Sequence, residues 1–150
     1  MASHTATLAP VIEAIAARIP KAPPDVRGSR EEIAEVVAAI AREFQPEQIV
    51  LFGSRVYGEP TDASDVDLMV IMDTPQTTGD PRALIRETAA SGARFWPHIH
   101  ICTPKRIALG LAEGDFFIED VMLKGITLYR RSGARMTDQE ANTNGADEGG

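Results

Sequence analysis

Two aspartates one residue apart are the part of this sequence best suited to binding a metal ion. Asp65 and Asp67 flank Val66 at the start of residues 66–72, a run of β-branched and apolar residues typical of a strand. Because strand side chains alternate between faces, the two carboxylates point the same way. They repel each other unless a cation lies between them. Oxygen ligands favour a hard ion, so the pair predicts a site for Mg²⁺ or Mn²⁺.

A glycine-serine pair upstream is suited to binding phosphate. Residues 49–52 form an uninterrupted apolar run, typical of a buried strand, and Gly53 ends it. Ser54 is placed to begin a short helix, whose free N–H groups and dipole favour an anion. Its hydroxyl and the guanidinium of Arg55 add further donors. For Arg55, a solvent-exposed position is an equally open interpretation.

The elements that hold these residues follow from capping signals and hydrophobic periodicity. Ser29 and Glu32 have the spacing of a helix capping box, and Pro46 marks where that helix stops. The apolar residues on one face of this helix are Ile33, Val36, Val37, Ile40 and Phe44. Further elements expected in order are a helix starting at Asp80 and Pro81, a strand over 98–102, a helix starting at Thr103 and Pro104, a helix from Asp115 to Leu123 followed by Gly125, and an edge strand over 126–129.

The chain divides into three segments. Residues 1–28 are expected to be an N-terminal extension and linker, with a short helix over 8–19. Residues 29–131 hold the folded domain, and the acidic, glycine-rich segment 132–150 is predicted to be disordered. Strands interleaved with helices predict an α/β fold, with a mixed α+β sheet of three to four strands covered by helices.

Composition excludes several classes of protein. With 150 residues and 43% hydrophobic residues, the chain can build one core. Its net charge of -7 offers no basic surface for nucleic acid. A single cysteine, Cys102, excludes an internal disulfide and is expected to be a packed thiol. No apolar stretch is long enough to span a bilayer and no signal peptide is recognisable, which predicts a cytoplasmic protein.

Residues 53–70, GSRVYGEPTDASDVDLMV, resemble the minimal nucleotidyltransferases of the DNA polymerase β-like superfamily. The shared pattern is Gly-Ser, a nearby glycine, and Ser-Asp-x-Asp-Leu. The resemblance extends from about residue 33 to residue 130, where FFIEDVMLKGITLYR is similar to the closing helix and strand of that family. It implies the nucleotidyltransferase fold and a nucleotide site formed by Gly53, Ser54, Arg55, Gly58 and Ser64.

The resemblance also implies two divalent ions, held by Asp65 and Asp67, that activate a hydroxyl and bind a triphosphate. Family members usually carry a third acidic residue on a later strand. If Thr103 anchors the comparison, His98 stands at that position, and a shift of two residues would place His100 there instead. Histidine is suited to acting as a base or to binding Mn²⁺, and is a poor Mg²⁺ ligand. We therefore assign catalytic and metal-binding roles to Asp65, Asp67 and His98.

The function implied is transfer of a nucleoside monophosphate, expected to be AMP, from ATP or another nucleoside triphosphate to a hydroxyl acceptor. Small relatives act as antitoxins that adenylylate a helical HEPN-type toxin, so a protein partner is one expected acceptor. The alternative is a catalytically impaired module that binds a nucleotide or a partner. The sequence leaves the oligomeric state open.

Overall fold

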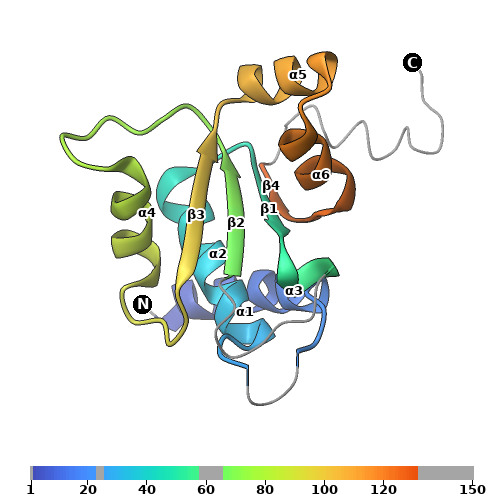
Figure 1. Cartoon of the computed structure of the whole chain (residues 1–150). Coiled ribbons are helices and arrows are strands. Elements are labelled where there is room, and N and C mark those ends of the chain that lie inside the picture. Colours follow the sequence, from blue (N-terminus) through green and yellow to red (C-terminus); the bar gives the residue numbers. More distant parts are fainter. Residues whose placement is uncertain (1, 23–25, 58–65, 132–150) are drawn as a thin grey trace.

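The computed structural model describes residues 2–22, 26–57 and 66–131, with side chains described from Ala9 onward. Its elements are α1 (Ala2–Ala17), α2 (Arg30–Phe44), β1 (Gln48–Phe52), α3 (Ser54–Tyr57), β2 (Val66–Ile71), α4 (Pro81–Ala90), β3 (Pro97–Cys102), α5 (Pro104–Glu113), α6 (Phe116–Lys124) and β4 (Ile126–Arg130). Figure 1 shows their arrangement around one sheet. No helix in these ranges is long and apolar enough to cross a membrane.

The sheet has four strands in the order β3-β2-β1-β4. Strand β1 pairs antiparallel with both β2 and β4, whereas β2 and β3 are parallel. The sheet is therefore mixed, and its register places Phe52 opposite Asp67 and Asp67 opposite His98. These two pairings bring the end of β1, the start of β2 and the start of β3 together.

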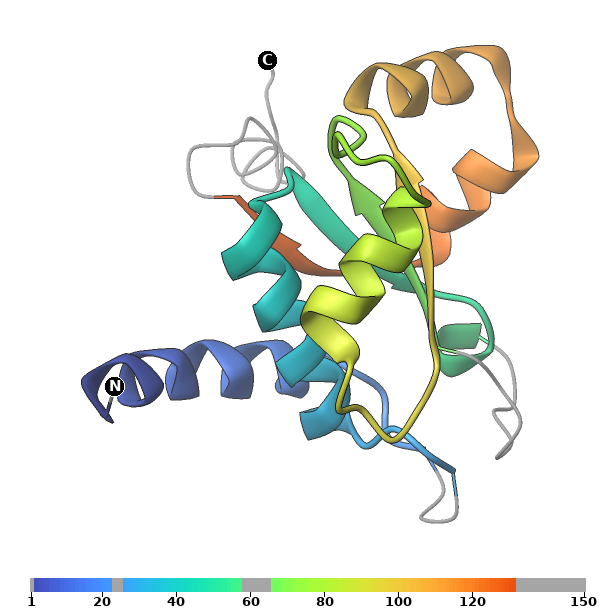
Figure 2. The ribbon, with the colours of Figure 1, turned by 90° about the vertical axis from the view of Figure 1, so that its left-hand side faces the viewer.

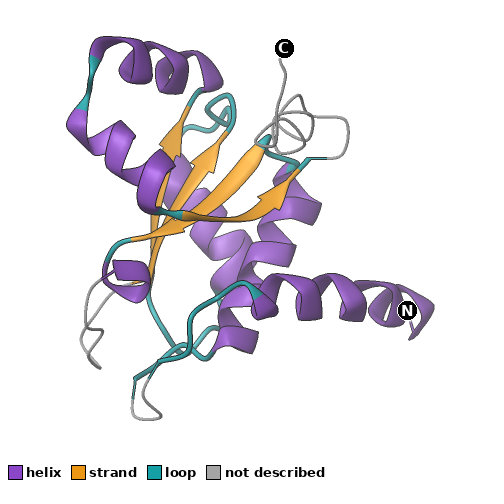
Figure 3. Cartoon of the chain, turned by 90° about the vertical axis from the view of Figure 1, so that its right-hand side faces the viewer, coloured by secondary structure: helices purple, strands orange, loops and turns teal. Residues whose placement is uncertain are grey.

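Helices cover both faces of the sheet, as Figures 2 and 3 show from opposite sides. One face packs against α1, α2 and α4 and buries the larger core, to which strand residues such as Leu51, Leu68 and Ile99 contribute. The other face carries a smaller core beneath α5 and α6, including Val50, Met69 and Ile118. Because strand side chains alternate, one strand supplies both cores.

The predicted fold class is confirmed, and so are the predicted starts of α2, α4, α5 and α6. Ser29 accepts from the backbone N–H of Glu32, whose side chain accepts from the N–H of Ser29, so the capping box is formed. Asp80, Thr103 and Asp115 are the N-caps of α4, α5 and α6. The expected edge strand is β4, which pairs only with β1 in the described sheet.

The first helix differs from the prediction of residues 8–19. It runs from Ala2 to Ala17, includes Pro10, and ends before Ile19. The N–H of Ile19 donates to the carbonyl of Ala16 in a tightened turn. Pro20 follows, and helical geometry is disfavoured for a residue before proline, which favours the end of the helix here.

The N-terminal segment packs on the predicted domain. Ile15 and Ile19 are 4% and 1% exposed and belong to the larger core, beside α2. Arg30 donates from Nε to the carbonyl of Ile19 over 2.7 Å. Ile15, Ala16 and Ile19 of this segment therefore belong to the larger core. The predicted disordered segment 132–150 lies outside the described residues.

Candidate functional site

Asp67 lies at the second position of β2, on the sheet face that carries α5 and α6. Its strand neighbours Val66 and Leu68 point into the larger core, whereas Met69 and Ile71 belong to the smaller one. Asp67 shares their face, opposite Phe52, and its side chain is 23% exposed. Alternation along the strand thus brings a carboxylate to the open end of this face.

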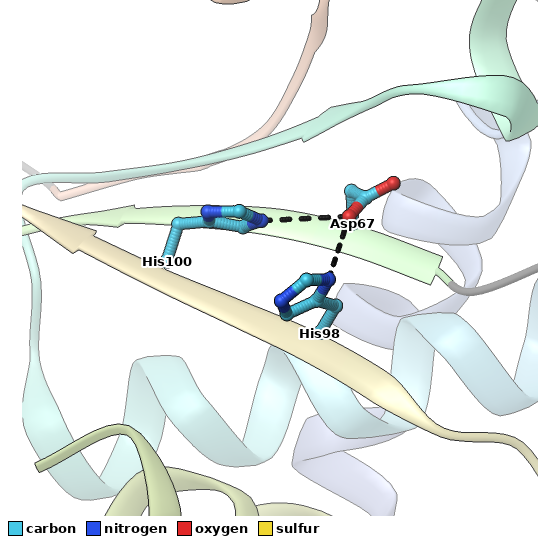
Figure 4. Close-up of side chains that lie close together, drawn as sticks. All are labelled: Asp67, His98 and His100. Atoms are coloured by element: carbon cyan, nitrogen blue, oxygen red, sulfur yellow. Dashed lines mark hydrogen bonds and ion pairs between the residues drawn. The ribbon is translucent and has the colours of Figure 1, made fainter. Parts of the chain in front are cut away.

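Both histidines of β3 turn toward Asp67, as Figure 4 shows. His98 Nδ1 lies 3.3 Å from Asp67 Oδ1, and His100 Nε2 lies 3.4 Å from the same oxygen. One donor atom from each of the three residues lies within 4.8 Å of the others, as metal ligands do. The sequence left open which histidine meets the carboxylate, and the structure places both there.

Aromatic rings surround His100 on the inner side of this cluster. The ring centroid of Phe52 lies 5.0 Å from that of His100 in an edge-on arrangement, and Phe117 of α6 lies at 6.0 Å. The rings of His98 and His100 are 4.5 Å apart. His100 is 27% exposed and His98 50%, so His98 is the outer member of the pair.

Phe52 and Phe117 were not among the residues predicted for the site. Phe52 is the last residue of the buried run before Gly53. A buried strand already accounted for its apolar side chain, so nothing in the sequence assigned it to the site. Phe117 follows Phe116 at the start of α6, and both are exposed to solvent. Two phenyl side chains beginning a helix after a capping aspartate were the available signal, because exposed aromatic residues often mark a binding surface.

Gly53 allows the close approach of the β1 end to Asp67. Its φ of +85° is in the left-handed region. A Cβ at this position would lie closer to Asp67 Oδ2 than van der Waals contact permits. The carbonyl of Gly53 accepts from the N–H groups of Val56 and Tyr57, which forms the short helix α3. The predicted phosphate-binding turn and the predicted carboxylate are therefore adjacent.

Ser54 begins α3 as expected, but Arg55 does not face solvent. Its guanidinium is buried and donates to the carbonyls of Arg27 and Gly28 over 3.1 and 2.7 Å. Burial lowers the pKa of Arg55 below its ordinary value. These bonds tie the segment before α2 to α3, and Arg55 is not available to bind phosphate while they hold. The exposed interpretation left open from the sequence is thus wrong.

Three predicted site residues, Gly58, Ser64 and Asp65, lie outside the described residues. Cys102 follows His98 and His100 on the same face of β3 and packs against the smaller core. Burial raises the pKa of the Cys102 thiol, as expected of a packed side chain. Asp67, His98 and His100 are therefore the described residues that offer ligands at this site.

Comparisons with known proteins identify a family for this chain. The model of the nucleotidyltransferase domain matches residues 33–122, more than half of the chain. No curated protein matches the sequence. The crystal structure of a "putative nucleotidyltransferase" from Sulfolobus solfataricus aligns with a TM-score of 0.45 and 16% identity, over 83% of this chain and 90% of that chain. The assignment to a family therefore depends on the domain model.

Proposed function

Because this chain belongs to the family of nucleotidyltransferase domains, we propose that it transfers a nucleoside monophosphate from a nucleoside triphosphate to a hydroxyl acceptor. The donor is ATP, with another triphosphate as the alternative. The coarse activity follows from the family. The residues and acceptor that we assign to it are our own inference.

The contact between Gly53 and Asp67 is the observation that carries this proposal. A glycine turn leading into α3 lies against Oδ2 of a carboxylate, so a phosphate bound at the turn would be within reach of an ion on that carboxylate. Gly53 and Ser54 are suited to the phosphates, and Gly58 and Ser64 complete the predicted set. The 23% exposure of Asp67 leaves it open to a ligand.

The chemistry exchanges one bond to phosphorus for another. The acceptor oxygen bonds to the α-phosphorus, the bond from that phosphorus to the bridging oxygen breaks, and pyrophosphate leaves. The proton of the acceptor hydroxyl passes to a base, for which a neutral imidazole of His98 is suited.

A divalent ion fits the donor set of this site. Asp67 would hold it together with Asp65, and His98 would stand in place of the third acidic residue, either as a ligand or as the proton acceptor. When bound, Mg²⁺ or Mn²⁺ would lower the pKa of the acceptor hydroxyl and neutralise charge on the triphosphate. Asp67 would hold the ion, and the turn at Gly53 would orient the phosphates.

The acceptor we propose is a protein, as in pairs of small nucleotidyltransferases with HEPN-type toxins. The site lies at the end of the sheet face that carries α6, where the ring of Phe117 is 6.0 Å from that of His100. Phe117 and its neighbour Phe116 are exposed, and a protein surface would cover them. A cytoplasmic location is part of the same proposal.

A second function is binding without transfer. It is favoured by the two histidines of β3, because His98, and not an acidic residue, is the residue paired with Asp67. In that case the domain binds a nucleotide or a partner protein without transfer, and the role of Asp67 is structural only.

Nucleotide binding to the purified chain tests the proposal. ATP and GTP are titrated with Mg²⁺, with Mn²⁺ and with chelator, using wild type and Asp67→Asn. We expect metal-dependent binding in wild type and loss of about tenfold or more in the variant, because a direct ligand is removed. Label from the α-phosphate should then appear on a protein in a lysate of the source cells.

The matched control is Asp73→Asn, because Asp73 is exposed just beyond the end of β2. It should bind nucleotide as wild type does. Binding with no label transfer to any acceptor would favour the binding module. Equal affinity of wild type and Asp67→Asn would contradict the assignment of Asp67 as a metal ligand and would be consistent with the binding module.

A further inference from the structure

The two oxygens of Asp67 face different groups. Oδ1 is the atom nearest both imidazoles, at 3.3 and 3.4 Å. Oδ2 lies on the side of Gly53, whose missing Cβ makes room for it. Figure 4 shows the second oxygen directed away from the two rings. One carboxylate thus separates a nitrogen-rich side from the side of the glycine turn at Gly53.

The distances on the nitrogen-rich side suit a small coordination sphere. Two ligand atoms, each about 2.0–2.1 Å from a tetrahedral ion, are about 3.3 Å apart. The separations of Asp67 Oδ1 from the two histidine nitrogens have this value. Charge-assisted hydrogen bonds between such groups are shorter, roughly 2.7–2.9 Å. Both separations are therefore compatible with an ion between the atoms, and all three ligand atoms lie within 4.8 Å of one another.

The surrounding structure holds these ligands in place. Asp67 and His98 are paired residues of adjacent strands, and His100 lies two positions along the same face. The ring of His100 is confined by Phe52 and Phe117. A ligand that is already oriented loses little conformational freedom on binding. The set of two imidazoles and one carboxylate is therefore largely formed before any ion binds.

We propose that Asp67 Oδ1, His98 Nδ1 and His100 Nε2 bind one divalent ion of borderline softness, Co²⁺ or Zn²⁺, in preference to Mg²⁺. Imidazole nitrogen suits these ions, whereas Mg²⁺ demands oxygen ligands. The role of this ion in transfer rests on the proposed function, but its binding does not. His100 becomes a ligand, and the Oδ2 side is left for the ion that accompanies the nucleotide.

Titration of Co²⁺ into the metal-free full chain tests the site without nucleotide. A visible ligand-field band should rise and saturate at one equivalent, and the imidazole proton signals of His98 and His100 should shift in the nuclear magnetic resonance spectrum. The third histidine of the chain, His4, lies in α1 and serves as the internal control. Zn²⁺ should displace Co²⁺ stoichiometrically, whereas a large excess of Mg²⁺ should leave the band unchanged.

Variants identify the ligands. His98→Asn and His100→Asn should each weaken Co²⁺ binding about tenfold or more, as loss of a ligand contact does. His4→Asn should bind as wild type does. His98→Asp replaces nitrogen by oxygen and should move the preference toward Mg²⁺. Circular dichroism checks the fold of each variant, and the measurements on wild type do not depend on it.

The inference is overturned if Co²⁺ gives no band, if Mg²⁺ displaces it at similar concentration, or if both histidine variants bind it as wild type does. Co²⁺ binding without nucleotidyl transfer would support this site and count against the proposed function. Nucleotidyl transfer with Mg²⁺ by a chain that does not bind Co²⁺ would support the proposed function and count against this site.

Discussion

The carboxylate of Asp67 lies between the two strands that flank β2. Its position beside each of them depends on the type of residue found there. Gly53 at the end of β1 admits Oδ2, while two histidines from β3 approach Oδ1. Any side chain at position 53 would enter the space that the carboxylate occupies. A single methyl group is therefore expected to disturb binding at this site.

Gly53→Ala should reduce metal-dependent nucleotide binding strongly and lower stability by roughly 1–2 kcal/mol, the cost of a left-handed conformation for a residue with a Cβ. The φ of +85° and the contact with Asp67 Oδ2 are the physical reasons. Calorimetric titration and urea unfolding measure the two effects.

Gly92→Ala is the matched control, because a Cβ there meets nothing within 4 Å. It should leave binding and stability nearly unchanged. Wild-type nucleotide affinity in Gly53→Ala would show that the turn and Asp67 do not act together.

At the scale of elements, α2 is held at its start by charge as well as by its cap. The backbone N–H of Ser29 donates to Glu32 over 2.9 Å, and Arg94 donates from Nε over 2.8 Å. The Ser29 backbone bond first, and Arg94 next, hold the pKa of Glu32 below its ordinary value of 4.5. Arg94 precedes β3, so this contact joins α2 to the strand that carries the histidines.

The lowered pKa gives stability a defined pH dependence. The ionised Glu32 stabilises the fold fully above the unfolded pKa, near 4.5, and this contribution is lost as the pH falls through the lower folded pKa. Glu32→Gln keeps the capping geometry but not the charge. Wild type should therefore be the more stable at neutral pH, and the difference should vanish in acid. Urea unfolding across this pH range measures it.

Glu31→Gln is the control for this pair, since Glu31 is exposed in the same first turn. The difference in free energy of unfolding between Glu31→Gln and wild type should vary less with pH. A Glu32→Gln difference that persists unchanged below the folded pKa would contradict the assigned cause.

At the scale of the whole molecule, the N-terminal helix shares the core of the sheet. Ile15 and Ile19 lie among the residues of α2 that the sequence assigned to the domain. Helix α1 is therefore expected to unfold together with the domain rather than before it.

Ile15→Ala should lower the free energy of unfolding by roughly 2–5 kcal/mol, since it removes a buried side chain and leaves a cavity. Val11→Ala, in the same helix but 44% exposed, should cost less than about 1 kcal/mol. Urea unfolding followed by circular dichroism and by the fluorescence of Trp96 should give coincident single transitions. An early loss of helix signal would show that α1 is a separate unit.

The sequence alone determined the elements and the face on which Asp67 points. Caps at Ser29, Asp80, Thr103 and Asp115 are local signals, because each cap satisfies N–H groups within its own first turn. Alternation along a strand is equally local, so the polar face of β2 was readable before the fold was known. The family pattern then identified the class of activity.

Tertiary structure decided what these residues meet. The pairing of β2 with β3 joins segments far apart in the chain, and its register brings both His98 and His100 to one oxygen of Asp67. Burial of Arg55 likewise depends on the segment before α2, which no pattern around Arg55 reports. Local periodicity assigns a side chain to a face, but only the packing of distant segments decides its neighbours, and with them the donor set of the site.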